Sequence, residues 1–276
     1  MEYLPNLDFN NAIAYLALVI SFFSYRQNRK ASKASNDIQQ KQQLMGINIQ
    51  LEEAWALLGG NIEKDGIYNF GKQKELNIAY RIIERCELTN PEYDKIYWLK
   101  GLYFVGKKRV DLAIEMYMKA LELNPKNYLA YNNLANALSK LEKYDEAIKH
   151  YKKSNDINPN FTTAIVNLGG LHQKIGQHVE AIELYRQALV QEPEDEITYN
   201  HLGISLVKLE NFDKAENAYK KAIELNDKYS YPYLNLADLY VIQKEKGKAY
   251  DMVNKAISIS PDNNYAKELL KKIPSI

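Results

Sequence analysis

Apolar and small residues recur with a period of 34 residues along most of the chain. Each period contains two stretches with apolar residues at helical spacing, and a polar turn such as residues 140–143 separates them. A proline marks the end of most periods, because proline has no N–H and disfavours helical geometry in the residue before it. This column reads Pro91, Pro125, Pro159, Pro193, Asp227 and Pro261. The pattern predicts a row of helix pairs.

Three more columns indicate how these helices pack. One contains only small residues: Gly101, Ala135, Gly169, Gly203 and Ala237. Another is alanine in every copy: Ala113, Ala147, Ala181, Ala215 and Ala249. The third holds a ring or a branched residue: Tyr117, Tyr151, Tyr185, Tyr219 and Val253. Small residues allow two helix backbones to approach closely, and large side chains fill the remaining volume, so we predict tightly stacked pairs.

These columns resemble the signature of the tetratricopeptide repeat, which places an aromatic residue, Leu-Gly, Ala, a second aromatic residue and Pro in 34 residues. Five copies match: 94–127, 128–161, 162–195, 196–229 and 230–263. The departures are Lys100 in a leucine column, Ser154 in an alanine column and Asp227 in the proline column. The resemblance implies an all-α fold, a right-handed α-solenoid of stacked antiparallel helix pairs.

The segments on either side of the five copies extend this pattern. Residues 45–93 contain Trp55, Leu58 and Gly59 at the Trp-x2-Leu-Gly spacing, followed by a turn eight residues longer than in the regular copies. We interpret them as a degenerate sixth helix pair with a long turn. Residues 264–276 alternate apolar and charged positions, and we predict a capping helix with a polar outer face.

The N-terminal segment differs in kind. Phe9–Tyr25 contains no charged residue and Arg26 follows directly, so we predict a single transmembrane helix at about residues 7–25, within an anchor and basic flank of residues 1–30. The positive-inside rule then places the N-terminus outside and the repeats in the cytoplasm. A cleaved signal peptide and a helix docked on a partner or on the membrane surface are the alternatives. Residues 31–44 are a polar stalk or a continuation of the helix.

Composition and motifs argue against several functions. The net charge is +1, which gives no basic field for nucleic acid. The single cysteine, Cys86, falls in a small-residue column, and we predict that it is buried packing. No metal-binding motif, phosphate loop or nucleophile–base pair is present, so we expect no enzyme activity, no cofactor and no metal.

The resemblance to tetratricopeptide repeats implies that the first helix of each pair lines a concave groove where ligands lie. The column next to the leucines reads Leu99, Asn133, Asn167, His201 and Asn235. Carboxamides donate and accept hydrogen bonds, so such a ladder could hold the backbone of an extended peptide. Asparagine is also frequent at this place in the family, which leaves a purely structural interpretation open.

Further groove candidates come from neighbouring columns. Lys140, Lys174 and Lys208 end the first helices, where cations favour the helix dipole or attract an acidic partner. Asn136 and Trp98 complete the predicted peptide-binding residues. We predict a membrane-tethered adaptor that binds a peptide segment or helix of a partner protein. The alternatives are an oligomerising scaffold subunit of a membrane assembly and a regulatory subunit of a separate enzyme.

Overall fold

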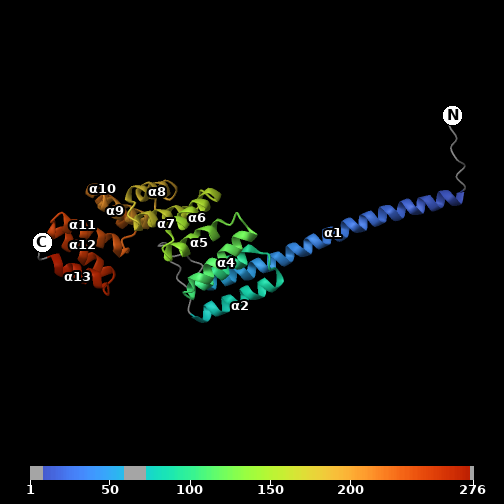
Figure 1. The fold of residues 1–276 in the computed structure, drawn as a ribbon, viewed down its shortest axis with the longest axis horizontal. Coiled ribbons are helices and arrows are strands. Elements are labelled where there is room, and N and C mark those ends of the chain that lie inside the picture. Colours follow the sequence, from blue (N-terminus) through green and yellow to red (C-terminus); the bar gives the residue numbers. More distant parts are fainter. Residues whose placement is uncertain (1–8, 59–72, 274–276) are drawn as a thin grey trace, which may run out of the picture. The chain divides into compact units, whose positions relative to one another are not determined.

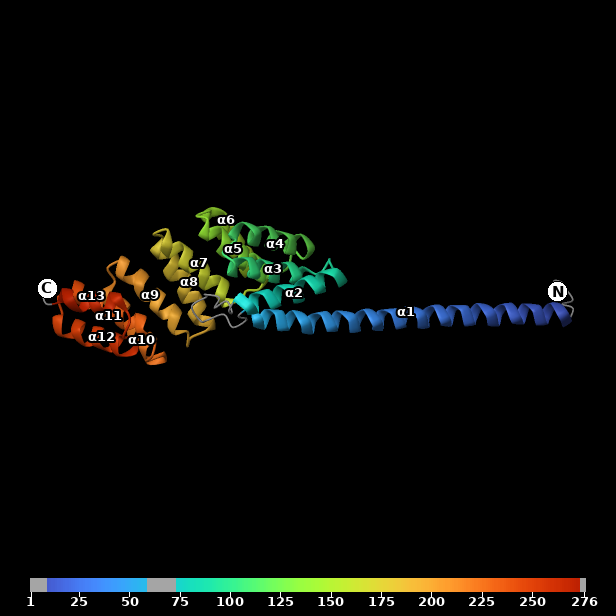
Figure 2. The same ribbon diagram turned by 90° about the horizontal axis from the view of Figure 1, so that it is seen from below.

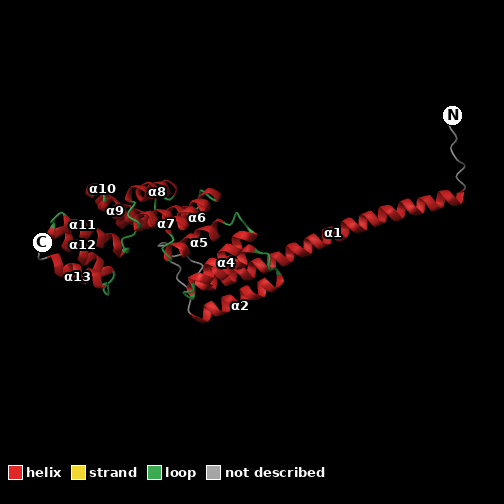
Figure 3. Ribbon diagram, in the orientation of Figure 1, coloured by secondary structure: helices red, strands yellow, loops and turns green. Residues whose placement is uncertain are grey.

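The computed structural model describes residues 9–58 and 73–273 of the chain. These residues form helices joined by turns, and no strand occurs among them (Figure 3). The chain divides into two compact units, Met1–Glu53 and Ala54–Ile276. The all-α prediction is confirmed for the described residues.

The first helix, α1, runs without interruption over Phe9–Leu57, a length of 49 residues (Figure 2). It contains no proline, and Gly46 is its one glycine, so nothing in the sequence stops a helix over this range. The expected anchor helix, the polar stalk of residues 31–44 and the first helix of the degenerate pair are therefore parts of one element. Residues 7 and 8 lie outside the described residues, as does most of the long turn, residues 59–72.

The transmembrane helix expected at about residues 7–25 is not supported. Among the described residues, no helix is long and apolar enough to cross a membrane. A membrane span needs about 20 consecutive, predominantly apolar residues. In α1 the apolar stretch is diluted by Asn10 and Asn11 at one end and stops before Arg26 at the other.

Helices α3 to α12 form consecutive pairs (Figure 1). Helix α2 (Gln73–Thr89) falls within residues 45–93, for which the degenerate pair stays a prediction, and its buried face contains Cys86, as the sequence predicted. The bounds of the others are α3 Asp94–Gly106, α4 Val110–Leu123, α5 Tyr128–Lys140, α6 Tyr144–Ile157, α7 Thr162–Lys174, α8 His178–Gln191, α9 Glu196–Lys208, α10 Phe212–Leu225, α11 Ser230–Ile242, α12 Lys246–Ile259 and α13 Asn264–Lys272.

The pairs stack in two layers. Each odd-numbered helix from α3 to α11 packs against the even-numbered helix that follows it, and each of α3, α5, α7 and α9 also contacts the odd-numbered helix of the next pair. In the described part of the chain, the even-numbered helices do not approach one another as closely. A stack that is closer on one side curves toward that side. The odd-numbered helices α3 to α11 therefore form its inner layer.

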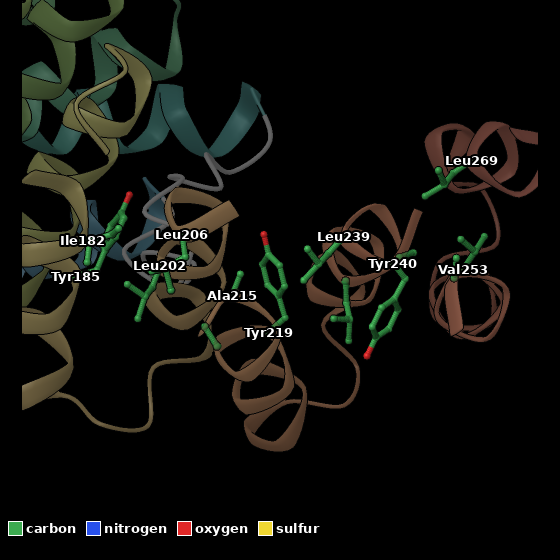
Figure 4. Packing of buried hydrophobic residues seen from close by; sticks show 14 of the residues in the cluster. Ile182, Tyr185, Leu202, Leu206, Ala215, Tyr219, Leu239, Tyr240, Val253 and Leu269 are labelled. Atoms are coloured by element: carbon green, nitrogen blue, oxygen red, sulfur yellow. The ribbon is translucent and has the colours of Figure 1, made fainter. Parts of the chain in front are cut away.

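Within the core, tyrosine rings pack against glycines of the preceding helix. A Cβ atom added to Gly169 would lie 2.7 Å from Cε1 of Tyr185, and one added to Gly203 would lie 2.4 Å from Cε1 of Tyr219. Both tyrosines are buried, and Figure 4 shows them in a row with leucines from successive helices. At its glycine positions the small-residue column is thus explained by ring volume, as the sequence predicted.

The turns within the pairs share an unusual backbone conformation. The second residue of each turn has a positive φ, which for residues other than glycine is sterically unfavourable. Only the third copy has glycine there, Gly176 with φ of 82°. The other four positions are Lys108, Glu142, Glu210 and Lys244, with φ between 57° and 62°. Each of these turns therefore carries a small local strain.

A polar contact closes most pairs at the end opposite the turn. Asn124 at the end of α4 donates from Nδ2 to Oδ2 of Asp94 at the start of α3, over 3.0 Å. Asn226 Nδ2 donates to Oε1 of Glu196 over 3.1 Å. Related bonds join Thr162 to Glu192 and Ser260 to Ser230. These bonds hold the start of the first helix to the end of the second within one repeat.

Candidate functional site

The inner layer contains a cavity of about 920 Å³. Its residues come from α5, α6, α7, α9 and the turn that precedes α9. The lining residues are Asn136, Ser139, Tyr151, Thr162, Thr163, Val166, Asn167, Gly170, Leu171, Lys174, Glu192, Pro193, Glu194, Asp195, Ile197 and His201. The volume lies in the range of about 300–1,000 Å³ that is usual for ligand pockets.

Amide side chains are hydrogen-bonded to each other across neighbouring inner helices. Asn167 Nδ2 on α7 donates to Oδ1 of Asn132 on α5 over 3.0 Å, and Asn132 Nδ2 donates to Oδ1 of Asn133 over 3.3 Å. Asn235 Nδ2 on α11 donates to Oδ1 of Asn200 on α9 over 2.7 Å. Asn167 and Asn235 of the predicted asparagine column therefore each donate to an asparagine in the preceding copy, one residue before that column. These bonds fix the spacing between adjacent pairs.

A second polar network joins α7 to α9 beside the cavity. Gln173 Nε2 donates to the backbone oxygen of His201 over 3.1 Å and to Oγ of Ser205 over 2.9 Å. The hydroxyl of Tyr185 donates to Oε1 of Gln173 over 3.3 Å. Burial raises the pKa of Tyr185, so this hydroxyl stays protonated and donates at physiological pH. Its ring stacks on His201 with centroids 5.8 Å apart, which orients the imidazole.

Charged side chains line opposite parts of the cavity. Glu192, Glu194 and Asp195 come from the turn before α9, and Lys174 comes from the last turn of α7. Asp195 is held as the N-cap of α9, because its Oδ1 accepts from the Ile197 N–H over 3.1 Å. Glu194 and Lys174 are both exposed, so either is accessible to a bound segment.

The structure brings four of the nine predicted site residues to the cavity: Asn136, Asn167, Lys174 and His201. Asn136 accepts a hydrogen bond from the Tyr151 hydroxyl. The Nζ of Lys174 lies 5.1 Å from the centroid of the Tyr144 ring. These four residues come from three consecutive inner helices and converge on one space.

The other five predicted residues lie elsewhere. Asn133 is buried, with 3% of its surface exposed, and Asn235 is bonded to Asn200 on α11 and α9. Lys140 and Lys208 are exposed at the ends of α5 and α9 but do not line the cavity.

Trp98 is the clearest departure from the predicted groove. It is 5% exposed and lies against Trp55 with ring centroids 6.4 Å apart. This large aromatic side chain on an inner helix is therefore part of the core, where it packs against the end of α1.

The sequence missed the residues that the turn and the start of α7 contribute. Thr162 and Thr163 line the cavity, as does the acidic turn of residues 192–195. The sequence feature that could have identified the acidic turn is its position directly before α9, which is the first helix of its copy. Within the described residues, no group of His, Cys, Asp and Glu is arranged to hold a metal ion.

Comparison with known proteins identifies the repeats. Four family models described as tetratricopeptide repeat match residues 94–127, 116–149, 161–228 and 206–273. No curated protein matches the sequence.

Several solved structures share the fold. One from the functional characterisation of pilF of Pseudomonas aeruginosa has a TM-score of 0.66 at 16% identity, and the match covers 82% of this chain and 99% of that chain. The structure of the Cut9–Hcn1 hetero-tetramer of the APC/C has a TM-score of 0.63 at 21% identity, and the match covers 72% of this chain and 40% of that chain. This chain therefore spans less than half of the Cut9–Hcn1 chain that it matches.

YrrB, described as a tetratricopeptide repeat protein with an unusual peptide-binding site, gives a TM-score of 0.55 at 23% identity, over 68% of this chain and 97% of that chain. At such identities the likeness shows the fold alone. The four family matches together cover most of residues 94–273, and they agree with the stacked pairs of the structure. The chain therefore contains tetratricopeptide repeats within residues 94–273.

Proposed function

We propose that this protein is a non-catalytic adaptor that holds an extended peptide segment of a partner protein in the cavity between α5, α7 and α9. The tetratricopeptide fold is that of protein-interaction scaffolds, which sets the class of function. The observation that carries the finer proposal is the cavity of about 920 Å³, lined by polar groups from three consecutive inner helices.

The chemistry of the lining suits a peptide backbone. Asn167 uses one amide hydrogen to bond Asn132, and a carboxamide has a second hydrogen and a carbonyl oxygen to offer a ligand. Asn136 and His201 add polar groups on the helices to either side. An extended segment presents alternating N–H and C=O groups, which match such a mixed set of donors and acceptors.

The rigidity of the lining also supports binding. The hydrogen bonds of Asn167 to α5 and of Gln173 to α9 hold the three inner helices at a fixed spacing before any ligand arrives. A cavity that is already formed loses less conformational entropy on binding. YrrB, which shares this fold, is described as having a peptide-binding site.

The expected attachment to a membrane is not part of this proposal, because no described helix is long and apolar enough to cross one. The location of the repeats in the cytoplasm stays a prediction from the sequence.

The test uses peptides selected against the full chain from a displayed library of random linear sequences. Binding of each selected peptide is then measured by fluorescence polarisation with the native chain and with Asn136→Ala, Asn167→Ala and His201→Ala variants. Each lost hydrogen bond to the backbone is expected to weaken binding by about 0.5–1.5 kcal/mol, which is roughly 2- to 12-fold in Kd.

The matched control is Asn217→Ala, which removes the same chemical group from an exposed position on α10, away from the cavity. It is expected to leave the Kd unchanged. Selected peptides that bind the native chain and the three cavity variants with equal Kd would place the binding site elsewhere and refute the proposal.

A further inference from the structure

The cavity of the inner layer follows the whole length of α7. All of its lining residues belong to the unit Ala54–Ile276. Because a helix rises by about 1.5 Å per residue, the first and last residues of α7 are about 18 Å apart along its axis. The α7 residues that line the cavity recur at helical spacing from one end to the other: Thr162, Thr163, Val166, Asn167, Gly170, Leu171 and Lys174.

The two ends of this cavity carry opposite charges. Glu192, Glu194 and Asp195 lie at the end where α7 and α9 begin. Lys174 lies at the other end, in the last turn of α7. The α7 lining residues between these ends carry no charge. A ligand that fills the cavity therefore meets negative charge at one end and positive charge at the other.

The acidic end is not neutralised by the chain itself. Within residues 9–58 and 73–273, none of Glu192, Glu194 and Asp195 forms an ion pair. Glu194 contributes to the raised pKa of Lys221 on α10, but the main cause is the bond of that ammonium group to Glu224, over 2.7 Å. Like charges gathered in a concave site concentrate their field, so this end attracts a cation.

Two of the three carboxylates are held in place by hydrogen bonds. Glu192 accepts a bond from the hydroxyl of Thr162, and Asp195 accepts from the Ile197 N–H over 3.1 Å. Glu194 is exposed and makes no hydrogen bond to a described residue. Its charge can therefore be removed without breaking a contact of the fold.

We propose that the segment bound in this cavity carries a lysine or arginine beside residues 192–195 and an aspartate or glutamate beside Lys174. The inference rests on the proposed function, because it names the side chains of the segment whose backbone the cavity binds. An extended chain advances about 3.3 Å per residue, so about five to six residues separate the two charges along α7. The uncharged residues between them lie over Asn167 and Gly170.

The test begins with peptides from the displayed library that bind the native full chain and lose affinity for Asn167→Ala, which identifies them as occupants of the cavity. Each peptide is synthesised again with its basic and acidic residues changed singly to glutamine. The Kd of every version is measured with the native chain, Glu194→Gln and Lys174→Gln. Both protein positions are exposed, so these variants should keep the helical circular dichroism of the native chain. A double-mutant cycle gives the coupling between each peptide charge and each protein charge.

One basic residue of the peptide is expected to couple to Glu194 and one acidic residue to Lys174, each by roughly 1.5- to 5-fold in Kd at low ionic strength. The two peptide residues should stand about five to six positions apart. A chain with both charges reversed, Glu194→Lys with Lys174→Glu, should prefer a peptide whose two charges are exchanged. The matched control is Glu183→Gln, at an exposed position on α8 outside the cavity, and no coupling is expected there.

The outcomes separate this inference from the proposed function. Peptides that lose affinity for Asn167→Ala but couple to neither Glu194 nor Lys174 would overturn the charge assignment and leave the cavity as the peptide site. Coupling of equal size to Glu183 would also overturn it, because that would be a general effect of net charge. Selected peptides that are all unaffected by Asn167→Ala would contradict the proposed function itself, and this inference with it.

Discussion

The glycine pair in α7 allows a direct test of how the helix pairs pack. Gly169 and Gly170 are adjacent in one helix, so changing either to alanine gives the same gain in helix propensity, about 0.5–1 kcal/mol. Their surroundings differ. A Cβ at Gly169 would lie 2.7, 3.0 and 3.2 Å from three carbons of the Tyr185 ring, whereas one at Gly170 would approach nothing closer than 3.9 Å, the Tyr185 hydroxyl.

The ring has little room to move away. Tyr185 has 0% of its surface exposed, and its hydroxyl is bonded to Gln173. Inserting a methyl group into such a core costs about 1–3 kcal/mol. We therefore expect Gly170→Ala to stabilise the chain by about 0.5–1 kcal/mol, and Gly169→Ala to be about 1–3 kcal/mol less stable than Gly170→Ala.

The assay is urea unfolding followed by circular dichroism at matched protein concentration, comparing midpoints and slopes of the native chain and the two variants. A rescue experiment identifies the cause. The last repeat has Ala237 and Val253 in the columns of Gly169 and Tyr185. In a Tyr185→Val background, Gly169→Ala should therefore be stabilising. A Gly169→Ala variant at least as stable as Gly170→Ala would refute the packing account.

Three further outcomes follow from the same structure. Glu210→Gly should raise stability by about 1 kcal/mol, since Glu210 has a φ of 57° where Gly176 has 82°, and a lower urea midpoint for this variant would contradict the assigned strain. Glu87→Gln should lower the free energy of unfolding by about 1–3 kcal/mol, because it leaves the ammonium of buried Lys100 without its carboxylate. Replacing both residues with leucine should recover most of this stability. Equal stability of Glu87→Gln and the native chain would count against a stabilising ion pair. Burial lowers the pKa of His150, so its neutral form stabilises the fold above about pH 6.5, and this contribution is lost as the pH falls through the lowered pKa. His150→Gln should therefore flatten the acid side of the plot of unfolding free energy against pH. An unchanged plot would show that His150 does not contribute to the pH dependence of stability.

Periodic packing could be predicted from the sequence because it depends on residue size at fixed spacing. Gly169 and Gly203 face rings, and Cys86 is buried, as the columns indicated. The helix α1 could be placed only in pieces, because its apolar, polar and amphipathic stretches were interpreted as separate segments. The absence of any helix breaker between Phe9 and Gly46 was the signal that joined them.

The site was harder to predict than the fold. A helical column assigns a residue to a face, but it does not say whether a neighbouring copy covers that face. Asn133 and Trp98 are on an inner helix and yet are 3% and 5% exposed, because adjacent inner helices pack closely. Thr163 and the acidic turn before α9 line the cavity although they belong to no repeating polar column.

The two-sided bonding of α7 has a mechanical consequence. Asn167 connects α7 to α5, and Gln173 connects it to α9, so the width of the cavity and the pitch of the stack are a single variable. Any force that changes the spacing of these three helices would therefore change the width of the cavity as well.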